Sequence, residues 1–171
     1  MSLSNVHGSG MRCDALPITH PDAARLVEEV QQEYVVRYGG RDDTPLDPTE
    51  FVAPQGMFFV GYLDGVPVAT GAWRRHVVPR GVEAGPAAEI KRMYVVAGQR
   101  GRGLARQMLG HLEATAAAAG AAAMILETGL NQPEAIALYE SSGYLPIPGF
   151  GFYADAPLSR CFAKSLRGWP A

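Results

Sequence analysis

One glycine-rich segment, Gln99-Arg100-Gly101-Arg102-Gly103-Leu104-Ala105, limits the possible folds of this chain more than any other stretch. The residues before it, 89–96, favour a strand, because they include Ile90, Tyr94 and Val95. From Gly103 onward, apolar residues recur at steps of three and four, as along one face of a helix. Backbone N–H groups and the positive end of a helix dipole meet at such a connection. The segment therefore predicts either an anion-binding loop or an ordinary glycine-rich connection.

The residue types in this loop suit a phosphate group. Gly101 and Gly103 allow the backbone and a ligand to approach closely, and Ala105 avoids a bulky side chain. Arg100 and Arg102 add positive charge. Two commoner nucleotide motifs are excluded, because a dinucleotide fingerprint needs a glycine at position 106 and a Walker loop needs Lys-Ser or Lys-Thr after the last glycine.

The rest of the chain alternates between strand and helix patterns. We expect a helix that is capped by Thr19, has Pro21 and Asp22 in its first turn and ends at Gly39-Gly40. Asp64-Gly65 predicts a two-residue hairpin turn between strands 57–63 and 66–73. The other expected elements are a short strand at 11–16, a helix from 103 to 120, a strand at 123–127, a helix at 133–142, and a strand pair at 144–147 and 158–166. This order implies an α/β fold in which helices cover both faces of a mixed sheet.

Composition narrows the class of protein. With 171 residues, of which 47% are hydrophobic, we expect one domain over residues 11–171, preceded at 1–10 by a disordered tail or a scar left by expression. The formal charge of -2 gives no reason to expect nucleic acid or membrane binding. Two cysteines far apart suggest a cytoplasmic protein without disulfides, and the four histidines form no metal-ligand motif. We therefore predict no metal.

Two motifs together resemble those of the GNAT superfamily of N-acetyltransferases. The segment Arg100 to Ala105 is similar to its R/Q-x-x-G-x-G/A signature. Downstream, the residues similar to its N-x-x-x-A-x-x-L-Y-x-x-x-G-F/Y segment are Asn131, Ala135, Leu138, Tyr139, Gly143 and Tyr144. The resemblance covers residues 57–166, with one departure at Ala97, where many relatives carry proline. It implies a central mixed, mostly antiparallel, splayed sheet of about six to seven strands.

The resemblance also implies a donor substrate, acetyl-CoA, and a set of residues to bind it. The pantetheine arm would pair with the backbone of Met93, Tyr94 and Val95, and the pyrophosphate would lie over Arg100, Gly101, Arg102, Gly103, Leu104 and Ala105. Asn131 would hydrogen-bond the arm, unless it caps the next helix.

Two residues are candidates for catalysis. By resemblance, Tyr139 would donate a proton to the departing thiolate, although a tyrosine on a helix can also simply pack on the sheet. Glu89 would accept the proton of the amine, unless it only pairs with Lys91 or Arg92, and Glu127 is a second candidate for the base.

The resemblance predicts acetyl transfer to a primary amine of a small molecule, amino acid or peptide, by direct attack in a ternary complex. Two alternatives stay open: a sensor that binds acyl-CoA without turnover, and an acyltransferase that uses a longer acyl-CoA. Acidic residues within 42–50 suggest a cationic acceptor. We expect loops 39–55, 76–87 and 146–157 to shape its pocket. The sequence does not identify the acceptor or decide whether the protein forms a homodimer.

Overall fold

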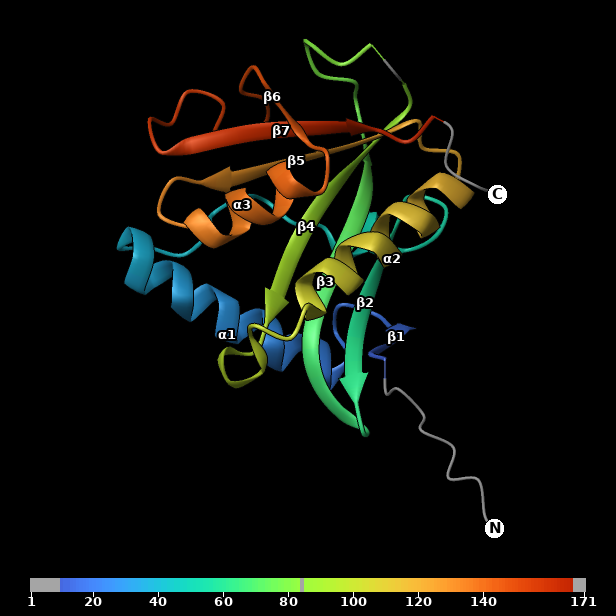
Figure 1. The fold of residues 1–171 in the computed structure, drawn as a ribbon, viewed down its shortest axis with the longest axis vertical. Coiled ribbons are helices and arrows are strands. Elements are labelled where there is room, and N and C mark those ends of the chain that lie inside the picture. The colour runs from blue at the N-terminus through green and yellow to red at the C-terminus, as the bar shows by residue number, and fades with distance from the viewer. Residues whose placement is uncertain (1–9, 84, 168–171) are drawn as a thin grey trace.

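A seven-stranded sheet forms the centre of the protein, and the computed structural model describes residues 10–83 and 85–167 (Figure 1). Along the sheet the strands lie in the order β1-β2-β3-β4-β5-β7-β6, and every neighbouring pair is antiparallel except β4 and β5. Their bounds are β1 Arg12–Ala15, β2 Gly56–Leu63, β3 Val66–His76, β4 Ala87–Val95, β5 Ala123–Gly129, β6 Leu145–Ile147 and β7 Ser159–Ser165. This confirms the predicted mixed, mostly antiparallel sheet. Most of the predicted N-terminal tail lies outside the described residues.

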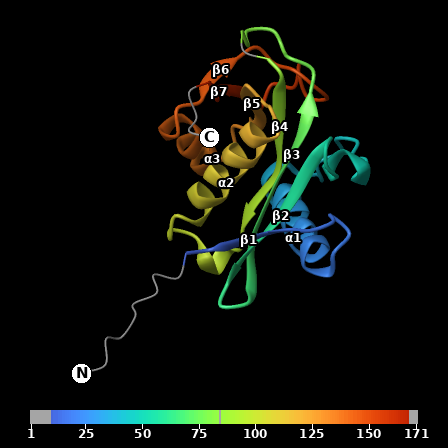
Figure 2. The ribbon, with the colours of Figure 1, turned by 90° about the vertical axis from the view of Figure 1, so that its right-hand side faces the viewer.

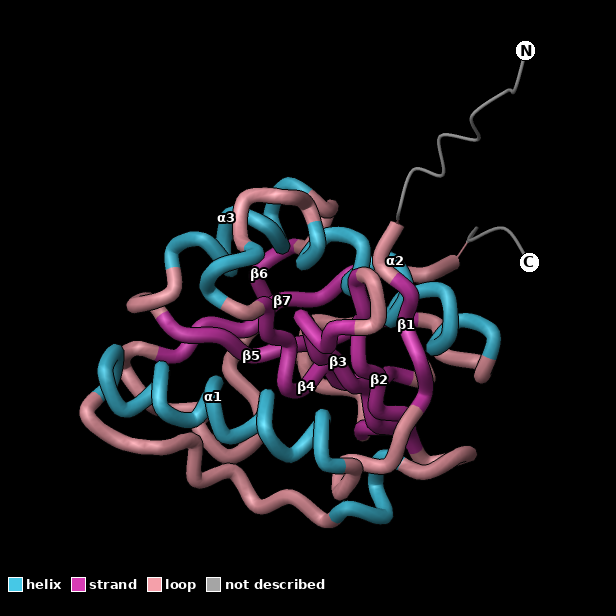
Figure 3. The backbone as a smooth tube through the Cα atoms, turned by 90° about the horizontal axis from the view of Figure 1, so that it is seen from below, coloured by secondary structure: helices cyan, strands magenta, loops and turns pink. Residues whose placement is uncertain are grey.

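Helices cover both faces of the sheet, as predicted. Helix α1 (Pro21–Tyr38) lies on one face, and α2 (Leu104–Ala118) and α3 (Pro133–Ser141) lie on the other, as Figures 2 and 3 show. Under α1, Leu26 and Val30 pack against Phe58 and Val60 of β2. The larger core lies under α2 and α3. No helix in the described part of the chain is both long enough and apolar enough to cross a membrane.

Local turn residues fix most of the element boundaries. Gly39 ends α1 with a φ of 76°, and Asp64 and Gly65 turn the β2–β3 hairpin with φ values of 48° and 79°. The predicted cap of α1 is wrong by one residue: His20 is the N-cap, and its ring nitrogen Nδ1 accepts a hydrogen bond from the Asp22 N–H at 3.2 Å. Imidazole thus takes the role that a threonine hydroxyl usually plays.

The sheet opens between β4 and β5, and this opening creates the site described below. The two strands pair only where Ala87 to Glu89 lies beside Ala123 to Ile125. Beyond Glu89 they diverge, as Figure 1 shows. One edge of β4 therefore carries backbone groups with no strand partner over its second half, which a ligand can pair with.

A buried carboxylate ties α2 to β7 and to the residue before β6. The Glu113 side chain is 4% exposed, and its carboxylate accepts hydrogen bonds from the Tyr144 hydroxyl at 2.9 Å and from Lys164 Nζ at 3.0 Å. A carboxylate in such a position is tolerated only while a cation and hydrogen bonds compensate for its lost hydration.

Lys164→Met should therefore lower the free energy of unfolding by about 2 to 3 kcal/mol, because it leaves the Glu113 carboxylate without its cation. Urea unfolding measures this as a lower midpoint with an unchanged slope. Lys164→Arg keeps the charge and should lose less. Equal losses in both variants would show that packing, and not the ion pair, is responsible.

Candidate active site

A cleft of about 440 Å³ occupies the opening between β4 and β5. Residues 90–93 of β4 and 126–129 of β5 form its two sides. The remaining walls come from the end of α1 and the loop after it, from α3, and from the loop before β7; they are Tyr34, Tyr38, residues 40–43, Gln132, Ala135, Tyr139, Tyr153 and residues 156–159. The cleft joins both faces of the sheet, so two substrates can meet in it.

The predicted anion-binding loop has the geometry of a cradle for negative charge. Gly101 and Gly103 both have a φ of 77°, and a Cβ at either position would meet no atom within 4 Å. In the described residues, no backbone N–H from Gly101 to Arg106 donates a hydrogen bond to a protein acceptor, and the first bond of the turn runs from the Gln107 N–H to the Gly103 carbonyl at 3.1 Å. Six successive free donors at the start of α2 fit a pyrophosphate.

The arginines of this loop do not all face the same way. The Arg100 side chain folds back, where its Nε donates to the Val95 carbonyl at 2.9 Å and its guanidinium pairs with Glu33 of α1. Arg100 thus anchors the loop to β4 and α1, and only its backbone faces the cradle. Arg102 is exposed and bonds Gln99. Arg106, which the sequence did not single out, lies one turn along and donates to Ser141 and Ser142 at the end of α3.

The strand predicted to pair with the pantetheine arm leads from the cradle to the cleft. Tyr94 and Val95 pair with Thr70 and Ala69 of β3 on one side. On the other side, β4 has no strand partner here, and Met93 lines the cleft. The strand thus offers an open edge between the cradle and the cleft.

Tyr139 lies where the predicted acid should be. It lines the cleft from α3, is 6% exposed, and packs edge-on against Tyr144 with ring centres 5.6 Å apart. Its hydroxyl bonds no other group among the described residues, and burial raises its pKa well above that of a free phenol. Tyr139 therefore keeps its proton near neutral pH, as a proton donor must.

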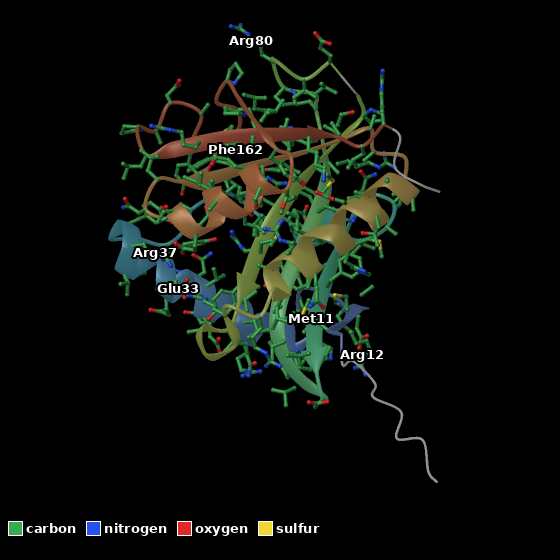
Figure 4. The ribbon with its side chains drawn as sticks, in the orientation of Figure 1. Met11, Arg12, Glu33, Arg37, Arg80 and Phe162 are labelled. Carbon is green, nitrogen blue, oxygen red and sulfur yellow. The ribbon has the colours of Figure 1, made fainter. Side chains whose placement is uncertain are left out.

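Asn131 has a structural partner. Its side-chain N–H donates to the Arg37 carbonyl of α1 at 2.9 Å, while Arg37 donates to the Asn131 carbonyl at 2.8 Å. Figure 4 shows Arg37 and Glu33 on α1, below α3. The alternative that Asn131 caps α3 is wrong, because Gln132 is the N-cap. A contact between Asn131 and the donor substrate stays a prediction.

Glu89 is buried in an ion-pair cluster outside the cleft lining. Its carboxylate accepts from Arg74 Nε at 2.9 Å, and Arg74 also bonds Glu50 at 2.6 Å. Lys91 Nζ and His76 Nε2 lie farther from Glu89, at 3.9 and 4.0 Å. The dominant partner is thus Arg74, which the sequence did not indicate.

Of the two glutamates predicted as the base, Glu127 is the one that lines the cleft. Burial raises its pKa to about 7; the negative charges of Asp42 and Glu89 act in the same direction, while Lys91 and a backbone hydrogen bond from Tyr153 oppose the shift. A carboxylate that titrates near neutral pH can accept and release a proton. The position of Glu127 at the carboxyl end of a strand parallel to β4 was the available sequence signal.

The aromatic residues of loop 146–157, which we expected to help shape the pocket, lie in different environments. Tyr153 lines the cleft, but Phe150 is buried in the core and Phe152 is exposed. Burial raises the pKa of both Cys13 and Cys161, which does not favour a thiolate nucleophile. No group of three metal-binding side chains occurs within residues 10–83 and 85–167.

Comparisons with known proteins agree with this geometry. A sequence model of the acetyltransferase (GNAT) family matches residues 24–144. A protein of Azospirillum brasilense named IAA acetyltransferase is 34% identical over 142 residues, which are 83% of this chain and 89% of that protein. The structure of a candidate acyl-CoA N-acyltransferase from Klebsiella pneumoniae is 27% identical, with a TM-score of 0.71 over 92% of this chain and 99% of the other. A candidate acetyltransferase from Salmonella typhimurium, solved with acetyl-CoA, shares the fold at 18% identity and a TM-score of 0.63, over 95% of this chain and 98% of the other.

Proposed function

Because this chain belongs to the acetyltransferase (GNAT) family, we propose that it transfers the acetyl group of acetyl-CoA to a primary amine by direct attack within a ternary complex. The observation that carries the proposal is the run of free backbone N–H groups from Gly101 to Arg106, next to the open edge of β4. These donors would hold the pyrophosphate. The open edge would hold the pantetheine arm, and the thioester end would then point into the cleft.

Glu127 and Tyr139 line this cleft and supply the two proton transfers. An ammonium group must lose a proton before it attacks, and the Glu127 carboxylate accepts that proton. The amine nitrogen then forms a bond to the acyl carbon while the carbon–sulfur bond breaks. Tyr139 gives its proton to the departing thiolate and regains one from the acylated nitrogen, so the products are a neutral amide and a free thiol. Glu89 stays the alternative base, although its carboxylate already bonds Arg74.

Two measurements on the intact protein test this function. Calorimetry should detect acetyl-CoA binding, and a panel of amines should contain acceptors that release thiol from acetyl-CoA. Binding without thiol release for any amine would instead support a sensor. Faster release from propionyl-CoA or succinyl-CoA would support a longer acyl donor. The absence of binding to all three thioesters would refute the proposal.

Tyr139→Phe should lower kcat by about 10- to 100-fold and leave the dissociation constant of acetyl-CoA nearly unchanged. The effect is moderate because a thiol, with a reference pKa of about 8.5, leaves readily even without a proton donor. Tyr62→Phe is the matched control, since it removes a phenol hydroxyl that bonds Asp22 outside the cleft. An unchanged kcat in Tyr139→Phe would assign Tyr139 to packing alone.

A further inference from the structure

Two successive cations, Lys91 and Arg92, line the same cleft. Neighbouring residues of a regular strand point to opposite faces, so this arrangement needs an irregularity. Lys91 pairs with Ala72 and Tyr94 with Thr70, which leaves one extra residue in β4, and Arg92 has a φ of 54°. A bulge of this kind re-aims side chains, and a non-glycine residue in the left-handed region is held there at a cost of about 1 to 2 kcal/mol.

Arg92 is held in place by the Asp42 carboxylate, which accepts three hydrogen bonds from within the protein. Arg92 Nη1 donates to Asp42 Oδ2 at 2.5 Å, and Asp42 Oδ1 accepts from the N–H and hydroxyl of Thr44 at 2.9 and 2.6 Å. The Asp42 N–H in turn donates to buried Gln31 at 2.9 Å. Burial would raise the pKa of Asp42, but the bonds from Thr44 and the charge of Arg92 lower it to about 2. Asp42 is therefore a fixed anion that positions Arg92.

Both cations keep unused hydrogen-bond donors. Arg92 is 6% exposed, yet its Nε has no hydrogen-bond partner in the described part of the chain. The Lys91 side chain is 11% exposed, and its nearest carboxylate is that of Glu89 at 3.9 Å, which Arg74 already binds at 2.9 Å. A buried hydrogen-bond donor that has no acceptor costs free energy. An anionic group of a ligand would supply acceptors for Lys91 and Arg92.

The sequence suggested that acidic residues within 42–50 attract a cationic acceptor, but three of these carboxylates are bound within the protein. Asp42 forms an ion pair with Arg92. Asp47 and Glu50 form a capping box at the start of the short 3-10 helix Pro48–Phe51. Glu50 also bonds Arg74. Besides Asp42, the charged side chains that line the cleft are Lys91, Arg92, Glu127 and the exposed Arg41 and Asp43. Arg41 pairs with Glu28, so the charges that are at least partly buried and left for a ligand are the two cations and the Glu127 carboxylate.

We propose that the acceptor is a free amino acid whose carboxylate binds Lys91 and Arg92 and whose α-amine faces Glu127. This inference rests on the proposed function and names its substrate class. An amino acid carries its carboxylate and its amine on one carbon, which matches cations and a base in a single cleft. Tyr34, Tyr38 and Tyr153 supply walls for its side chain. A lysine side chain or an N-terminus of a protein offers no carboxylate next to the amine, so it would leave the Lys91 ammonium and Arg92 Nε without a hydrogen-bond acceptor.

Matched sets of acceptors test the proposal. Each set contains an amino acid, its amide and its decarboxylated amine, such as phenylalanine, phenylalaninamide and phenethylamine, and thiol release from acetyl-CoA is followed with each. The amino acid should have the highest kcat/KM, by about 10- to 100-fold, because a hydrogen bond to a charged group contributes about 1.5 to 3 kcal/mol. Equal or faster reaction of the amide or the amine would overturn the amino acid assignment and leave the acetyltransferase function intact. Thiol release with other amines but with none of these sets would overturn the amino acid assignment alone, and no thiol release with any amine would overturn both.

Variants separate charge recognition from a structural role. In Lys91→Met, the ratio of kcat/KM for the amino acid to that for its amide should fall by about 10-fold or more, and Lys91→Arg should restore most of it. Arg80→Met is the control for loss of a positive charge, since Arg80 is exposed on the loop between β3 and β4, far from α1 (Figure 4). A drop of equal size for both acceptors in Lys91→Met would assign Lys91 to structure and contradict the proposal.

Discussion

Glu127→Gln should lower kcat/KM by about 100- to 1,000-fold, the size of effect expected when a general base is lost. Glutamine keeps the shape of the side chain but cannot accept the proton of the attacking ammonium. Glu140→Gln is the matched control, because Glu140 is an exposed carboxylate on α3 outside the cleft lining. The measurement is thiol release at saturating acetyl-CoA over a range of acceptor concentrations.

The pH dependence identifies the base more sharply than the rate alone. Glu127 accepts a proton only when ionised, so activity should rise as the pH increases through about 7. The proton that Glu127 accepts comes from the bound ammonium group, so log kcat/KM should rise with a slope of about one below pH 7 and level off above it, up to the pKa of the amine. In Glu127→Gln the break near pH 7 should disappear. If Glu89→Gln removes that break and Glu127→Gln keeps it, Glu89 is the base.

As the pH rises, the activity should increase, but the stability of the folded protein should decrease. The folded state raises the pKa of Glu127 from 4.5 to about 7, so folding favours its protonated form. Its contribution to stability is therefore fully present below about pH 4.5 and is lost as the pH rises through about 7. Glutamine stays neutral, and so Glu127→Gln should unfold at a higher temperature than the wild type at pH 8. A catalytic carboxylate in a desolvated site is expected to cost stability in this way.

The sequence predicted those parts of the fold that depend on neighbouring residues. Asp64-Gly65 indicates its hairpin because two residues suffice to make the turn, and Gly101 and Gly103 indicate the cradle because the strand and the helix flank it directly. The same argument holds for Gly39 at the end of α1.

The parts that were missed depend on distant segments. Nothing in the local pattern shows that β4 and β5 separate after Glu89, or that a bulge turns Arg92 toward a loop 50 positions earlier in the chain. The partner of Glu89 is Arg74 on β3 and not its neighbour Lys91, because antiparallel pairing places Arg74 directly opposite. Charge pairs across a sheet follow register, which is a property of the whole fold.

Gly103→Glu should weaken acetyl-CoA binding by about 100-fold or more, which is the second large effect that the structure predicts. Gly103 begins α2 with a φ of 77°, where a side chain is strained, and its N–H is one of the free donors of the cradle. A glutamate would also place negative charge where the pyrophosphate must lie. At 100 times its dissociation constant, a ligand stabilises its protein by about 2.7 kcal/mol, so the thermal shift with acetyl-CoA should be nearly abolished.

Two control variants separate charge from backbone strain in this experiment. Gly110→Glu introduces the same side chain within α2, where a Cβ would meet no atom within 4 Å and φ is ordinary, and it should bind acetyl-CoA like the wild type. Gly103→Ala adds strain without charge and should lower stability by about 1 kcal/mol with a smaller loss of affinity. If Gly103→Glu binds within about threefold of the wild type, the donor's pyrophosphate does not lie on this loop. If Gly110→Glu weakens binding equally, a general charge effect explains the loss. Only a loss confined to position 103, and larger for glutamate than for alanine, fits a pyrophosphate held by the backbone at the start of α2.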